Sequence, residues 1–216
     1  MVKKVAKSKL VAPNLPPKLP LTHINKFHDE DCVELSLIQD CAFEDQTAEN
    51  IAINQVLFKH VVFNRFHLPH AQLTDIVFEQ CDLSNVDFSQ CFMDRVQFTN
   101  CKLVGINMTE ASLKNTVFDN CNANYAVMRY LNCKQSYFRN TSFAEADLYS
   151  ATLVDVAFAR CNLDKVQFSG TKLSGIDIST CQFYQLALTA DDLRGCTIAP
   201  AQAIALANIF GVVIKE

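Results

Sequence analysis

Apolar residues recur at every fifth position through most of this chain. In the successive units Ala71-Gln-Leu-Thr-Asp and Ile76-Val-Phe-Glu-Gln, the third residue is Leu or Phe and the first is small or β-branched. This phase runs unbroken from Val33 to Ile198. A period of five fits neither an amphipathic helix, which repeats at about 3.6, nor a half-buried strand, which repeats at about 2. The repeat therefore predicts a solenoid, in which short stacked turns share one continuous core.

The five-residue unit resembles that of the pentapeptide-repeat family, whose units read roughly Ala-Asp/Asn-Leu/Phe-x-x. The resemblance covers residues 33–198. It implies an all-β fold, a right-handed quadrilateral parallel β-helix, in which four units make one square coil. The last region of the chain adds a C-terminal α-helix to this predicted fold class.

If four units close a coil, residues 20 apart should stack on each other. The sequence agrees, because residues at this spacing are sorted by type. One predicted core column consists of Phe58, Phe78, Phe98, Phe118, Phe138 and Phe158. A second column holds Cys41, Cys81, Cys101, Cys121, Cys161 and Cys181.

The ten Cys are expected to be reduced thiols that fill tight corners. Parallel side chains on stacked coils keep their Cβ atoms farther apart than a disulfide requires. Reduced thiols fit a cytoplasmic protein. The N-terminus lacks the apolar stretch of a signal peptide, and no run of the chain approaches membrane-spanning length.

Three regions are predicted: a basic, proline-rich arm at 1–28, the β-helix at 29–198, and a helix with a tail at 199–216. The arm carries six Lys and no acidic residue, and its four Pro favour an extended conformation. We expect its Leu residues at 15, 19 and 21 to pack on the first coil and cover the open end of the core. Phe66 occupies a corner that normally takes a small residue, so we also expect a local distortion there.

Nothing in the sequence favours catalysis, a metal or a cofactor. His60, His67 and His70 cluster near Phe66, but no Cys/His pair has zinc-ligand spacing, so they are interpreted as surface residues. The chain has no nucleophile elbow, no glycine-rich phosphate loop, and no long loop from which a cleft could be built. The prediction is a non-enzymatic protein; an enzyme with a site on the irregular coil around Phe66 is the weakest hypothesis.

The last region predicts a helix that begins near Pro200, continues from Ala201 to Phe210, and ends at Gly211. Its apolar residues cover too wide an arc of the helix surface for a helix with one face exposed to solvent. A cap over the last coil would use only part of this surface, which leaves the rest for a homodimer interface. The candidate interface residues are Ile204, Leu206, Ala207, Ile209, Phe210, Val212 and Ile214.

This ending, Thr197-Ile-Ala-Pro-Ala-Gln-Ala-Ile-Ala-Leu-Ala-Asn-Ile-Phe-Gly-Val-Val-Ile, resembles the C-terminal dimerisation helix of Qnr-type quinolone-resistance proteins of Gram-positive chromosomes. Asn14-Leu-Pro-Pro-Lys-Leu-Pro-Leu and Cys121-Asn-Ala-Asn-Tyr-Ala-Val-Met-Arg are also similar to those proteins. The resemblance implies a rod-shaped homodimer that binds DNA gyrase and topoisomerase IV and protects them from fluoroquinolones. Plasmid-borne members use two projecting loops, for which the unbroken register here leaves no room.

Residues 29–214 contain 22 acidic and 12 basic residues, a balance of −10. An acidic rod is attracted to a basic protein surface, such as a DNA-binding groove, and is repelled by nucleic acid itself. The alternative interpretation of this charge is that an acidic surface simply keeps the protein soluble. A structural or scaffolding repeat protein with another protein partner is the alternative function. The candidate topoisomerase-facing residues are Asp75, Glu79, Asp82, Asp87 and Asp94.

Overall fold

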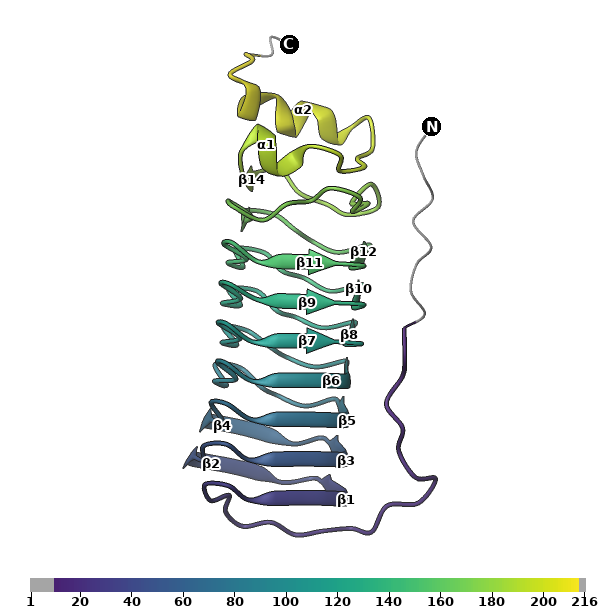
Figure 1. Ribbon diagram of the computed structural model, residues 1–216, viewed down its shortest axis with the longest axis vertical. Helices are drawn as coiled ribbons and strands as arrows, with labels where there is room; N and C mark the ends of the chain where they lie inside the picture. The colour runs from purple at the N-terminus through teal and green to yellow at the C-terminus, as the bar shows by residue number, and fades with distance from the viewer. Residues whose placement is uncertain (1–9, 214–216) are drawn as a thin grey trace.

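The computed structural model describes residues 10–213 and shows a rod of about eight stacked coils with small helices at its C-terminal end (Figure 1). The longer strands are β1 (Cys32–Gln39), β2 (Ala42–Thr47), β3 (Ala52–Lys59), β4 (Val62–His67), β5 (Gln72–Glu79) and β6 (Phe92–Thr99). The shorter ones are β7 (Ser112–Lys114), β8 (Val117–Asp119), β9 (Asn132–Lys134), β10 (Tyr137–Arg139), β11 (Thr152–Val154), β12 (Ala157–Ala159), β13 (Val166–Gln167) and β14 (Leu186–Ala187). The helices are α1 (Ala190–Leu193), α2 (Gln202–Leu206) and the 3-10 turn η1 (Ala207–Phe210).

Every strand pair in the solenoid is parallel and joins residues 20 apart. The partner of Cys32 is Ala52, that of Gln72 is Phe92, and the same offset pairs β10 with β12. Isolated bridges continue this register between the strands. The predicted coil of four units and the predicted right-handed parallel β-helix are thus confirmed. In the coil of residues 71–90, we number the four faces in chain order: 71–75, 76–80, 81–85 and 86–90.

The corners of each coil explain the five-residue period. Every fifth residue from Glu30 to Lys165 has a positive φ, with Gly105 in the same series. A residue in this left-handed region reverses the chain direction locally, as it does in type II turns, and Asn and Asp tolerate it better than most side chains. The expected distortion at Phe66 was wrong: Arg65 has a φ of 49°, and Phe66 pairs with Gln46 in the ordinary register.

The predicted phenylalanine column forms the centre of the core. All six rings are buried, and the centroids of neighbouring rings lie 4.7 to 5.1 Å apart. The rings of Phe58, Phe78 and Phe98 are stacked nearly parallel, at 7° and 3°. Stacked coils thus turn a sequence repeat into a continuous column of aromatic contacts.

The N-terminal end of the core is covered differently from our expectation. The leucines at 15, 19 and 21 do not close it, and Leu21 is half exposed. Instead Phe27 is fully buried, with its ring centroid 5.0 Å from Phe43 and 5.4 Å from Phe66. Gln46 holds this segment in place, because its Oε1 accepts a hydrogen bond from Phe27 N (3.0 Å). The large Phe66 ring therefore fits its corner because Phe27 packs against it.

The cysteines agree with the packing interpretation. All ten are free, and seven are buried. Burial raises the pKa of the Cys133 thiol to about 12, so this side chain behaves as a small apolar group. Within residues 10–213, no helix is long and apolar enough to cross a membrane.

Candidate protein-binding surfaces

The five candidate acidic residues do not share a face. Asp75 lies at the corner between the first and second faces, Glu79 on the second, Asp82 on the third and Asp87 on the fourth, and Asp94 is on the first face of the next coil. Because one coil takes 20 residues, acidic residues that are close in sequence point in different directions. No single flat partner surface can contact all five.

Asp75 is the most deeply enclosed of these candidates. Only 6% of the residue is exposed, and Arg95 donates two hydrogen bonds to its carboxylate, of 2.7 and 2.8 Å. The backbone N–H of Asn14 donates a third, of 2.8 Å. These bonds, above all those from Arg95, hold the pKa of Asp75 below its usual range. Asp94 pairs with the same guanidinium, so both carboxylates are already engaged within the molecule.

The remaining three candidates are also partnered. Their contacts join residues 20 apart: Glu79–Lys59 at 3.1 Å, Asp82–Lys102 at 3.0 Å and Asp87–Asn107 at 2.8 Å. Each contact bridges neighbouring coils on the outside of the rod. The two exposed ion pairs with Lys contribute about 1 kcal/mol or less to stability, but they do reduce the charge that a partner meets. The amide of Asn107 binds Asp87 without changing its charge.

The uncompensated negative charge lies instead on the first coil. Glu30, Glu34, Glu44 and Glu49 are exposed, and no basic residue in the described chain lies within 4.0 Å of their carboxylates. We call these four residues the acidic end. Residues 29–100 contain 13 acidic and only 3 basic residues, so the pairing partners are too few in this half of the rod.

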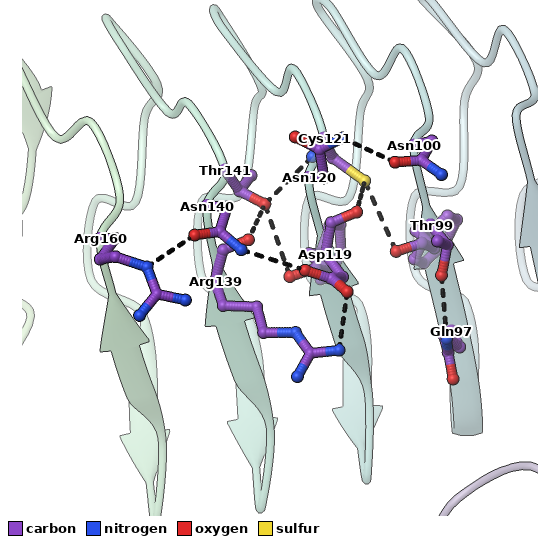
Figure 2. Close-up of polar contacts among 12 residues, drawn as sticks. Gln97, Thr99, Asn100, Asp119, Asn120, Cys121, Arg139, Asn140, Thr141 and Arg160 are labelled. Carbon is purple, nitrogen blue, oxygen red and sulfur yellow. Dashed lines mark hydrogen bonds and ion pairs between the residues drawn. The ribbon is translucent and has the colours of Figure 1, made fainter.

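The C-terminal half contains equal numbers of acidic and basic residues. Residues 101–198 hold nine acidic and nine basic residues. Figure 2 shows how polar side chains on successive coils reach each other: Asn120 donates to Asn100 at 2.6 Å, Arg139 to Asp119 at 2.7 Å and Arg160 to Asn140 at 2.8 Å. Polar ladders thus connect the coils of this half, and its equal numbers of acidic and basic residues leave it nearly neutral, in contrast with the acidic end.

A histidine belongs to the same kind of ladder near the N-terminal end. His60 Nδ1 lies 3.0 Å from Asp40 Oδ1, and His60 Nε2 lies 2.7 Å from Gln80 Oε1. Both ring nitrogens face acceptors, an arrangement that suits the doubly protonated imidazolium. The hydrogen bond that His60 donates to Gln80, together with the one it donates to Asp40, therefore raises the pKa of His60. No group of three or more metal-ligating side chains occurs in the described residues.

We expect His60 to titrate above its ordinary value of about 6.5. Because the folded pKa is raised, the stabilisation from this ladder is fully present below the unfolded pKa and is lost as pH rises through the folded pKa. Two-dimensional NMR of the imidazole, assigned with His60→Gln, measures the pKa directly. Gln80→Leu and Asp40→Asn should each lower it; an unchanged midpoint in both variants would contradict the ladder.

The C-terminal cap is built around two residues. Gln202 is buried, and its Nε2 donates to the carbonyl oxygens of Ile178 (3.0 Å) and Cys181 (2.7 Å). Leu206 is only 2% exposed and packs into the core. This corrects its assignment to the dimer interface: Leu206 belongs to the cap. Gln202 could not be assigned to the cap from the sequence, where its only distinguishing mark is that it is a polar residue in an apolar segment.

The outer side of this cap is apolar and open. Ile204 is 65% exposed and Phe210 59%, and Val212 and Val213 are exposed beside them. Ala207 and Ile209 are half-buried, and Ile209 packs against the core from outside. The candidate interface residue Ile214 lies outside the described residues. The helix is shorter than predicted, because α2 ends at Leu206 and continues as the 3-10 turn η1.

Family models of pentapeptide repeats match a large part of the solenoid. A model of the pentapeptide repeat region matches residues 91–168, and a model of pentapeptide repeats in eight copies matches residues 57–95. The uncharacterized protein YisX of Bacillus subtilis (strain 168) is 36% identical over 206 residues, which cover 94% of this chain and 96% of that protein.

Two solved structures are similar at low sequence identity. QnrB1 (full length), a plasmid-mediated fluoroquinolone resistance protein, is 16% identical with a TM-score of 0.46, over 85% of this chain and 96% of that one. HetL, a pentapeptide repeat protein involved in heterocyst differentiation regulation from Nostoc sp. strain PCC 7120, is 15% identical with a TM-score of 0.40, over 79% and 84%. The matching family models and the 36% identity to YisX agree with the register of the coils, and the chain belongs to the pentapeptide-repeat family.

Proposed function

We propose that this protein is a cytoplasmic, non-enzymatic homodimer that binds DNA gyrase or topoisomerase IV and protects it from fluoroquinolones. The observation that carries the proposal is the acidic end, where four exposed carboxylates have no basic group within 4.0 Å among the described residues. A DNA-binding surface is basic, and complementary charge accelerates and orients such an encounter.

The dimer would form through the open side of the C-terminal cap. A two-fold axis there covers Ile204 and Phe210 of both copies with each other. Because the acidic end is at the opposite end of the rod, it stays accessible at both tips of such a dimer (Figure 1). The resemblance of the C-terminal segment to the dimerisation helix of Qnr-type proteins supports the same arrangement.

Mimicry of DNA is partial in this proposal. The charged candidates along the rod are paired, so the protein does not copy the regular row of phosphates on duplex DNA. The acidic end provides a local electrostatic anchor. Contacts beyond it depend on shape and on uncharged side chains, including those of the polar ladders.

A binding assay with purified gyrase tests the proposal against the alternative, a scaffolding repeat protein with another partner. We expect saturable binding, together with fewer ciprofloxacin-induced double-strand breaks in a gyrase cleavage assay. A monomeric control, such as Phe210→Asp, separates the contribution of dimerisation. If gyrase and topoisomerase IV both show no binding and no protection at protein concentrations far above that of the enzyme, the scaffolding alternative replaces the proposal.

A further inference from the structure

The second face of the rod carries an apolar row on its outside. In the strand register, Leu37 lies next to Leu57, and Leu57 next to Val77. Gln97 follows on the next coil and interrupts the row, which resumes one coil later at Val117. These are outward positions, whereas the inward neighbours of each belong to the core. The corresponding outward positions of the third face are apolar only in its first two coils, at Ala42 and Val62, and are polar beyond them, at Asp82, Lys102 and Asn122. The apolar row therefore extends farther along the rod on the second face than on the third.

The N-terminal arm runs alongside this row. Pro20 O accepts from Leu37 N (2.8 Å) and Thr22 N donates to Leu37 O (2.8 Å), which pairs the arm with the free edge of β1. Farther along, Asn14 is held by its bond to Asp75, and its carbonyl accepts from Gln55 Nε2 (2.8 Å).

The arm then passes on toward the middle of the rod. Val11 N donates to Asn115 Oδ1 at 3.2 Å, so a stretch of 12 residues follows the corner that borders the second face across several coils. Figure 1 shows the arm outside the ends of β5 and β8, with its N-terminal side directed toward the C-terminal helices. Val117, beside the last anchor, is only 8% exposed.

One side of the arm faces the rod. Pro13, Leu15, Pro16 and Leu19 are half-buried, whereas Lys18 and its neighbour Pro17 are exposed. The prolines have no N–H that needs a partner and favour an extended backbone before binding. Grooves and sheet surfaces generally bind proline-rich segments in this way, through a few backbone hydrogen bonds and the apolar side chains that lie between them.

From this geometry we propose that the second face is a docking track for an extended, leucine- and proline-rich segment, and that the arm occupies the track in cis. Its natural occupant in trans is such a segment of another protein chain. Attachment through the arm's own chain gives a high effective concentration, so the cis arm keeps the track closed until it is displaced. The acidic rod also favours a partner segment that carries lysine, as the arm does at Lys18 and Lys26.

The test uses the full chain and a fluorescent synthetic peptide of residues 10–26. In the arm variant Leu15→Asp/Leu19→Asp, two charges on the inner side of the arm should release it. We expect the peptide to bind this variant more than about tenfold more tightly than the wild type by fluorescence anisotropy. Asn14→Pro removes the N–H that anchors the arm to Asp75, together with the exposed Asn14 side chain, and serves as a milder arm variant if the first one fails to fold.

A matched pair of substitutions locates the bound peptide. Val77→Glu, added to the arm variant, places a charge in the track and should abolish the gain in affinity. Val62→Glu is the same change at an outward position of the third face, where 44% of the residue is exposed, and should leave binding unchanged. Equal affinity for wild type and both arm variants, or equal effects of Val77→Glu and Val62→Glu, would overturn the proposal.

Discussion

Phe118→Ala is expected to lower the free energy of unfolding by about 3 to 5 kcal/mol. Its side chain is fully buried in the middle of the column, with ring centroids 4.7 Å from Phe98 and 5.1 Å from Phe138. Coils above and below fix the backbone at their hydrogen-bonding spacing, so they cannot collapse into the space that the ring leaves. Urea denaturation followed by circular dichroism measures the loss.

The chain provides a matched control for this cavity. Phe92 belongs to β6 but points outward, with 43% of the residue exposed. Phe92→Ala removes the same atoms without opening a cavity and should cost less than about 1 kcal/mol. Comparable losses in the two variants would contradict the assignment of the inner and outer positions.

Phe210→Asp is expected to convert the proposed dimer into a monomer of 24.2 kDa. Phe210 is 59% exposed on the single chain, so the monomer can solvate the new carboxylate. In the proposed interface the same charge would lie among apolar side chains without a partner, at a cost of several kcal/mol. Light scattering after gel filtration gives the mass directly.

Ile204→Asp should have the same effect, because Ile204 is 65% exposed on the same side of the cap. Val62→Asp is the control, since it adds the same charge at an exposed valine near the other end of the rod. A monomeric wild type would show that the cap serves only its own chain. A dimer that persists in both C-terminal variants would move the interface to another surface.

The repeat made the solenoid predictable because one physical requirement recurs at every unit. An inward Leu or Phe must meet its counterpart 20 residues away, so the phenylalanine column from Phe58 to Phe158 could be identified before the structure. The left-handed corners set the length of the unit, and they hold even at Arg65, next to the oversized Phe66. The large Phe66 side chain was therefore a poor predictor of a distorted backbone at this corner, because the ring of Phe27 packs against it.

The arm was harder to predict because it has no repeat to set its register. Its composition indicated an extended conformation, but not which of four faces it follows. The anchors are single side chains at coil corners, such as Asp75 and Asn115, and a corner Asp or Asn has the same appearance in sequence whether or not it holds the arm. One outward position, Val77, gives a signal in retrospect, because it is apolar where the third face of the same coil has Asp82.

The distribution of charge on the surface could be determined only from the three-dimensional structure. The acidic balance of the rod was evident from composition, but the charged candidates chosen by proximity in sequence fell on different faces. Stacking of the coils places Lys59 beside Glu79 and Lys102 beside Asp82, and these ion pairs neutralise much of the charge of the two carboxylates. What remained were carboxylates of the first coil, whose basic partners are absent from the coil above because that coil has only Lys59 and Arg65.

The most direct test of the proposed function compares two charge variants in their binding to gyrase as a function of salt concentration. The first neutralises the acidic end by Glu30→Gln, Glu34→Gln, Glu44→Gln and Glu49→Gln. The second removes the same number of charges from paired positions by Glu79→Gln, Asp82→Asn, Asp87→Asn and Glu145→Gln. We expect the first to weaken binding at least about tenfold and to flatten its salt dependence, and the second to change binding less than about threefold. Equal binding by the first variant and the wild type, with folded dimers in both, would contradict the account.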